Sequence, residues 1–183
     1  MKSTFLLSLL LSALALSSCG HHPDAAADPN LLLSTSFENL ANWLTELQSA
    51  TLTHERAHSG TTSLKVDAAH EFSLTYNNAL ARLHPTTPRK LKVAAWVWLP
   101  NAQAAATLVT TLADPATPGA KPQFWDGLNL NETVKTYGQW MPVSKVITLP
   151  ANASPAHRLS LYLWRTAGNQ PVYLDDLTVS IVE

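Results

Sequence analysis

A strict alternation of side-chain type in two stretches of the chain most constrains its fold. In residues 90–99 and 158–165, aliphatic side chains occupy every second position, and aromatic or polar side chains occupy most positions between them. This period of two is that of a β-strand with one buried face. The aliphatic positions are Val93, Ala95, Val97 and Leu99 in the first stretch and Leu159, Leu161 and Leu163 in the second. Both stretches are therefore predicted to be strands that line a core.

Similar stretches recur at short spacing, separated by Pro, Gly, Ser and Asn. They are predicted as strands at 31–38, 50–57, 63–67, 71–77, 90–99, 104–112, 140–149, 158–165 and 171–183. One short helix or turn is predicted at 39–47, where apolar residues follow helical spacing. About nine strands without alternating helices favour an all-β protein, a jelly-roll β-sandwich of two antiparallel sheets.

The segment 114–127 interrupts this pattern. It contains three Pro, two Gly and the pair Phe124 and Trp125. Such composition predicts a long loop, and long loops in compact domains are often functional.

The overall composition limits the classes of function. A chain of 183 residues with a formal net charge of −1 predicts one domain and gives no basic surface for nucleic acid. The single cysteine, Cys19, excludes a disulfide within the chain.

The N-terminal residues predict export and lipidation. Residues 1–18 have a short basic start and an apolar stretch, as in a signal peptide. The sequence Leu-Ser-Ser-Cys that ends at Cys19 resembles a bacterial lipobox, in which the cysteine is lipidated and becomes the N-terminus; an ordinary secretory signal is the alternative. Residues 19–30 then form a flexible tether, and residues 31–183 form the β-sandwich domain. The expected location is the bacterial cell envelope, at the outer membrane or cell surface.

Five motifs along the chain resemble carbohydrate-binding modules of families four, nine and twenty-two. In order they are SFENLANWLTE, HERAHSGTTSLKVD, LKVAAWVWLP, TYGQWMPVSKVITLP and VYLDDLTVS. The resemblance covers residues 31–183 and rests on the order and spacing of the motifs. It implies a galactose-binding-like jelly-roll fold and a carbohydrate ligand.

The last predicted strand contains a carboxylate that needs a partner. Asp175 shares its parity with Tyr173, Leu177 and Val179, so it is predicted among core positions. The resemblance implies a structural calcium ion held by Glu38 and Asp175, with backbone carbonyls near Ser36, His58 and Lys65. Calcium takes six to eight oxygen ligands of these kinds. The alternative is that Asp175 pairs with Lys65 or accepts hydrogen bonds from backbone N–H groups.

Large aromatic residues occupy the non-aliphatic positions of the two clearest strands. Trp96, Trp98, Tyr162 and Trp164 are therefore predicted on a solvent-facing surface, where flat rings can stack on sugars. Trp125 is predicted to join them from the 114–127 loop. The alternative is that this loop covers the rings and makes a second small core. Possible polar contacts to a sugar are Asn77, Arg82, Thr107, Gln123, Asp126 and Arg165.

Catalytic motifs are weak in this sequence. Residues 54–58 match the zinc-protease pattern H-E-x-x-H, which works on a helix. The preceding residues are strand-like, and Ser59-Gly60 follows directly. Asp175 and Asp176 are adjacent, so they are predicted to point to opposite faces of a strand and not to form a glycosidase pair. The sequence thus predicts a non-catalytic, lipid-anchored carbohydrate-binding protein; a module that binds a protein partner is the alternative.

Overall fold

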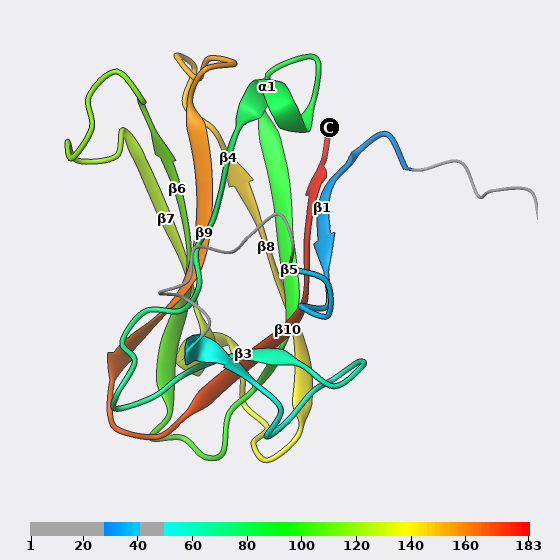
Figure 1. The fold of residues 1–183 in the computed structure, drawn as a ribbon, viewed down its shortest axis with the longest axis vertical. Coiled ribbons are helices and arrows are strands. Elements are labelled where there is room, and N and C mark those ends of the chain that lie inside the picture. The colour runs from blue at the N-terminus through cyan, green and yellow to red at the C-terminus, as the bar shows by residue number, and fades with distance from the viewer. Residues whose placement is uncertain (1–27, 41–49) are drawn as a thin grey trace, which may run out of the picture.

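The computed structural model describes residues 28–40 and 50–183. Ten strands in these residues form two sheets that face each other as a sandwich (Figure 1). Every strand pair is antiparallel. The predicted all-β sandwich is confirmed.

The first sheet, sheet A, has the strand order β2-β3-β10-β5-β8, and β1 also pairs with β10. Its strands are β1 (Leu31–Thr35), β2 (Leu52–Thr53), β3 (Ser63–Val66), β5 (Lys90–Trp98), β8 (Trp140–Thr148) and β10 (Val172–Ile181). β10 is central because it pairs with β5 on one side and with β3 and β1 on the other.

The second sheet, sheet B, has the order β4-β9-β6-β7. Its strands are β4 (Tyr76–Ala79), β6 (Ala105–Ala113), β7 (Phe124–Asn129) and β9 (Arg158–Ala167). Two single-turn helices, α1 (Leu80–Leu83) and α2 (Leu130–Thr133), follow β4 and β7; the sequence patterns did not predict them. Each buries one leucine, Leu80 or Leu130.

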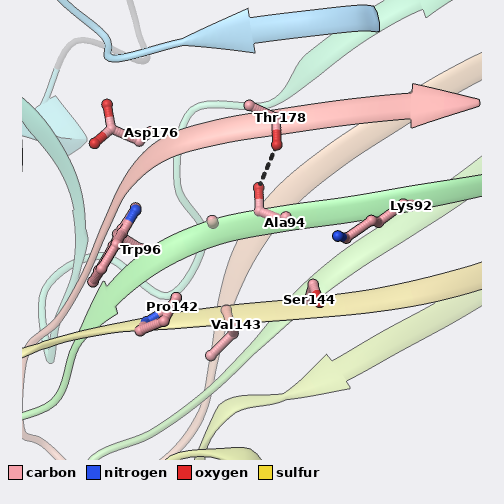
Figure 2. A pocket seen from close by; sticks show the side chains of 9 residues that line it. Lys92, Ala94, Trp96, Pro142, Val143, Ser144, Asp176 and Thr178 are labelled. Carbon is pink, nitrogen blue, oxygen red and sulfur yellow. Dashed lines mark hydrogen bonds between the residues drawn. The ribbon is translucent and has the colours of Figure 1, made fainter. Parts of the chain in front are cut away.

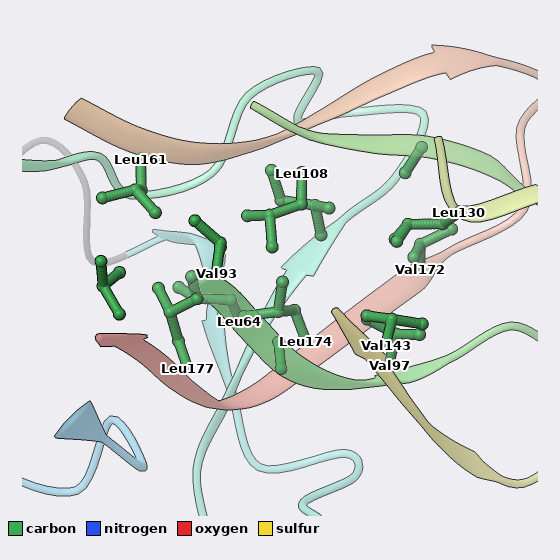
Figure 3. Packing of buried hydrophobic residues seen from close by; sticks show 14 of the residues in the cluster. Leu64, Val93, Val97, Leu108, Leu130, Val143, Leu161, Val172, Leu174 and Leu177 are labelled. Carbon is green, nitrogen blue, oxygen red and sulfur yellow. The ribbon is translucent and has the colours of Figure 1, made fainter. Parts of the chain in front are cut away.

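The core fills the space between the sheets. Figure 3 shows Val93, Val97 and Val143 of sheet A packed toward Leu108 and Leu161 of sheet B. The predicted aliphatic parities of 90–99 and 158–165 are confirmed, since Val97 and Leu161 are at most 1% exposed. This burial is the main contribution to the stability of the fold.

A bulge in β10 corrects the predicted parity of the last strand. Val172 and Leu174 lie in the core before the bulge, and Leu177 and Val179 after it. The register against β5 shifts between Asp175 and Thr178, where Asp176 has a φ of 46°. One extra residue reverses the alternation, so Tyr173 and Asp175 do not share a face with Leu177.

The 114–127 segment is only partly a loop. Residues from Phe124 onward form β7, which pairs with β6 from Leu112↔Phe124 to Thr107↔Asn129. Phe124 packs against the core, and its neighbour Trp125 points to the outer face. The alternative of a covering loop does not hold for these two residues, because they belong to a strand and the Pro-rich part ends before them.

Several predictions fall on residues that the structure does not describe. Residues 1–27 include the signal segment and Cys19, and residues 41–49 include Trp43 and most of the helix predicted at 39–47. Within residues 28–40 and 50–183, no helix is long and apolar enough to cross a membrane.

Candidate functional site

The four aromatic residues predicted on one surface lie on two different sheets. Tyr162 and Trp164 belong to β9 of sheet B, whereas Trp96 and Trp98 belong to β5 of sheet A. All four side chains point away from the core and are partly exposed. The parity prediction holds, but the sequence did not show which strands share a sheet. The structure therefore contains two separate aromatic surfaces on opposite sides of the sandwich.

We call the outer surface of sheet B around Tyr162, Trp164 and Trp125 the aromatic face. Tyr162 pairs with Val109, and Trp164 with Thr107, so both rings stand beside β6. On the other side of β6, Trp125 of β7 pairs with Thr111. Aromatic rings therefore flank a central strand whose outward residues, Thr107, Val109 and Thr111, are at most 8% exposed.

Gly127 allows the indole of Trp125 to lie along the sheet. A Cβ atom at position 127 would come within 2.7 Å of both the Trp125 ring and the Thr107 methyl group. Because glycine leaves this space free, the ring lies beside Gly127 on β7 and remains 52% exposed. Trp125 thus joins the aromatic face as predicted, from a strand position.

Two residues that sequence reasoning did not assign to a site complete the aromatic face. Phe72 stacks on Trp164 with ring centroids 6.2 Å apart and meets Tyr162 edge-on. The indole N–H of Trp164 donates a 3.0 Å hydrogen bond to Glu71. A continuous strand is predicted at 71–77, but Phe72 forms an isolated bridge with Trp164 and β4 begins only at Tyr76. Phe72 thus packs against both β9 rings.

Polar groups continue the aromatic face toward the start of β9. Asn77 donates a 2.8 Å hydrogen bond to Ser160 and accepts one from the guanidinium of Arg158. Of the other predicted polar contacts, Thr107 lies on this face, whereas Asp126 bonds Lys145 at the sheet edges. This surface therefore combines flat rings with hydroxyl, amide and guanidinium groups.

The rings on sheet A already have partners from the 54–62 segment. His58 stacks on Trp96 with centroids 3.9 Å apart and planes at 13°. Arg56 lies over the ring of Trp98 at 3.9 Å. One face of each indole is thereby used within the protein, in contrast to the exposed Trp125.

The carboxylates expected to hold calcium are instead bound by N–H and O–H donors of the 58–62 turn. Asp175, fully buried, accepts hydrogen bonds from the backbone N–H groups of His58, Ser59 and Asp176 at 2.7, 3.1 and 2.7 Å. Burial raises the pKa of Asp175, and these backbone hydrogen bonds oppose the rise. Glu38 accepts the backbone N–H groups of Thr61 and Thr62 at 2.9 and 2.6 Å, and the hydrogen bond from Thr61 is the main cause of its lowered pKa.

This donor set does not fit a calcium ion, which binds carbonyl and carboxylate oxygens. No group of three or more His, Cys, Asp or Glu residues within the described ranges is arranged to hold a metal. The pairing of Asp175 with Lys65 is also absent from the described contacts, because Lys65 bonds Glu55 and Asp67. Calcium at Glu38 and Asp175 stays a prediction of the family resemblance.

Chelation tests that prediction directly. An ion bound only to the folded protein raises its melting temperature by mass action. Since the turn already satisfies both carboxylates, we expect EDTA to leave the melting temperature unchanged. A fall in EDTA that added calcium reverses, and added magnesium does not, would restore the calcium site.

Comparison with known proteins identifies the fold. No protein-family model and no curated protein matches the sequence. Among solved structures, a CBM22-1 xylan-binding domain from Paenibacillus barcinonensis Xyn10C is 20% identical, with a TM-score of 0.52 over 84% of this chain and 96% of its own. The CBM22-1–CBM22-2 tandem domain of Xyn10C gives 17% and 0.59 over 88% and 52%. A further xylan-binding CBM22 domain gives 14% and 0.51 over 87% and 97%. The chain has a β-sandwich fold similar to that of these CBM22 domains.

Within this β-sandwich, the H-E-x-x-H segment has no helix. Residues 54–58 lie in bends after β2, so the two histidines do not share a helical face. His54 contacts the carbonyl of Thr61, and Glu55 binds Lys65 at 2.7 Å and the hydroxyl of Tyr173 at 2.6 Å. These contacts fasten the segment to β3 and β10 and do not form a zinc site.

The Glu55 contacts predict that part of the protein's free energy of unfolding is lost at acidic pH. The hydrogen bond from Lys65, then that from Tyr173, lowers the pKa of Glu55 below its usual value of 4.5. A lowered folded-state pKa gives stability that is complete above about pH 4.5 and is lost as pH falls through the folded value. Because the side chain is 55% exposed, we expect less than about 1 kcal/mol. Glu55→Gln should melt below wild type at pH 7, and the difference should shrink as the pH falls below about 4.5; a difference that stays constant with pH would contradict the linkage.

Proposed function

We propose that the protein binds a linear polysaccharide of the xylan class across the aromatic face of sheet B. The observation that carries this proposal is the arrangement of Trp164 and Tyr162 on one side of β6 and Trp125 on the other. Flat rings offer stacking surfaces for the C–H faces of sugar rings. Glu71, Asn77 and Arg158 supply acceptors and donors for sugar hydroxyl groups. The CBM22 domains of similar fold are described as xylan-binding, which suggests the ligand class.

We propose that this binding is not accompanied by catalysis. Glycoside hydrolysis uses two carboxyl groups about 5–10 Å apart on either side of the bond. Among the described contacts of Tyr162, Trp164 and Trp125, Glu71 is the carboxylate present. The Asp175–Asp176 pair lies on sheet A and is bound to the 58–59 backbone and side chains. These features favour a binding module over an enzyme.

A panel of oligosaccharides tests the function. Purified protein is titrated with xylohexaose, cellohexaose and mannohexaose, and binding is followed by calorimetry and tryptophan fluorescence. We expect xylohexaose to bind with a change in fluorescence, because tryptophan rings form the proposed surface. Absence of binding to all three at millimolar concentration, with the fold confirmed by circular dichroism, would overturn the proposal and favour a protein partner for the aromatic face.

We also propose that the protein is attached to a membrane of the bacterial cell envelope through Cys19. The lipobox-like sequence that ends at this residue supports the proposal. A labelled fatty acid should be incorporated into the protein and should be lost in Cys19→Ala. Release of the unlabelled wild-type protein into the medium would contradict the anchor.

A further inference from the structure

A pocket on the outer face of sheet A, opposite the aromatic face, has no role in the function proposed above. It has a volume of about 620 Å³ and is lined by residues of β5, β8 and β10. Its floor is a row of small side chains, because Ala94 pairs with Thr178 on one side and Ser144 on the other. Figure 2 shows this row between Trp96 and Lys92.

One end of the pocket provides an aromatic wall and an acceptor. Trp96 stands between Asp176 and Pro142 (Figure 2). Its orientation is fixed because His58 stacks on it and binds Asp176 at 2.5 Å. Ser59 donates a second hydrogen bond to Asp176. The histidine, carboxylate and indole thus form a rigid end wall, and a ring held in place in advance loses little entropy when a ligand stacks on it.

The other end of the pocket provides a cation without a partner. Lys92 is exposed, and Figure 2 shows its amine directed back along the floor toward Ala94. No ion pair or hydrogen bond of the Lys92 amine is found within residues 28–40 and 50–183. Lys92 lies four residues from Trp96 on β5, so their Cα atoms are about 13 Å apart. Because the lysine side chain extends toward the floor, the distance from its amine to the Trp96 ring is shorter, roughly the length of a disaccharide.

The combination specifies the chemical class of the ligand. Hydroxyl groups of Ser144 and Thr178 on the floor suit a polar ligand with an apolar face, and Trp96 suits the ring of a sugar. Among the described lining residues, the carboxylate is that of Asp176, at the Trp96 end of the pocket. The unpaired Lys92 at the other end therefore favours an anionic group of the ligand there. We propose that this pocket is a second carbohydrate site, which binds an acidic oligosaccharide with one pyranose ring on Trp96 and a uronic acid carboxylate on Lys92.

The two sites have separable requirements, so one set of variants distinguishes them. Purified protein is titrated with tetragalacturonate and with xylotetraose at 20 and 300 mM NaCl. In Lys92→Ala, tetragalacturonate affinity should fall at least 10-fold at low salt and lose most of its salt dependence. Xylotetraose affinity should not change. Trp164→Ala should show the reverse, because Trp164 lies on sheet B.

Two further variants serve as controls, one for the loss of a positive charge and one for an effect of Lys92→Ala on folding. Lys135→Ala removes an exposed lysine outside the pocket and should bind tetragalacturonate as wild type does. Ser144→Tyr fills the pocket floor from an exposed strand position and should abolish that binding without lowering the melting temperature. Equal tetragalacturonate affinity in wild type, Lys92→Ala and Ser144→Tyr, or no binding to wild type at millimolar concentration, would overturn the second site whatever the result with xylotetraose.

Discussion

Replacing Asp175 with alanine is expected to destabilise the protein by about 2–4 kcal/mol, because backbone N–H groups lose their acceptor. The carboxylate is fully buried and accepts three N–H groups. Two of them belong to the 58–59 turn, more than a hundred residues away in sequence. At this size of chain the change corresponds to a fall in melting temperature of about 5–15 °C, which calorimetry would measure.

The neighbouring residue gives a matched control for this prediction. Among the residues that the structure describes, the Asp176 carboxylate bonds the side chains of His58 and Ser59, and the backbone N–H of Asp176 donates to Asp175. Asp176→Asn keeps a residue type that tolerates the φ of 46° and should cost less than about 1 kcal/mol. If Asp175→Ala melted within about 2 °C of Asp176→Asn, the N–H bonds of the turn would not be the stabilising element that the geometry indicates.

The second large effect is expected for Trp164→Ala, which should weaken xylohexaose binding by about 10–100-fold. Trp164 combines a stacking surface, contact with Phe72 and a hydrogen bond to Glu71. Its removal therefore deletes one ring of the aromatic face, one of the two ring contacts of Phe72 and the hydrogen bond to Glu71. Calorimetric titration of wild type and variant gives the ratio of the two dissociation constants.

A tryptophan of sheet A serves as the comparison. Trp98 is similarly exposed, but it lies under Arg56 and on the opposite sheet. Trp98→Ala should therefore leave xylohexaose affinity unchanged. Loss of binding in Trp98→Ala together with retained binding in Trp164→Ala would place the polysaccharide on sheet A and refute the assignment of faces.

Local patterns in the sequence predicted most of the strands, but they missed β7, misplaced β4 and did not show which strands are neighbours. The alternation in 90–99 and 158–165 correctly separates core residues such as Val97 and Leu161 from outward aromatics. Which sheet each strand joins depends on pairing across the whole chain, so Trp96 and Trp164 received the same assignment although they lie on different sheets. Local periodicity contains no information on such long-range pairing.

The prediction for the last strand failed for a different physical reason. A period of two persists only while the ladder has no extra residue, and the bulge at Asp176 adds one. The same bulge explains why the adjacent carboxylates of Asp175 and Asp176 both reach the 58–59 turn, although alternation predicted opposite faces. Aspartate is among the residues that accept a positive φ, but this tolerance alone does not locate a bulge in a sequence.

The pairing of β1 with β10 also decides how the sandwich can be attached to a support. Leu31 pairs with Ser180, and the N–H of Ile181 donates to the carbonyl of Asn30 at 2.8 Å. Both ends of the described domain therefore leave from the same tip of the sandwich (Figure 1). If the domain were coupled to a bead or sensor chip through either end, it would be attached at that tip. Both outer sheet surfaces would then remain accessible to soluble polysaccharide chains.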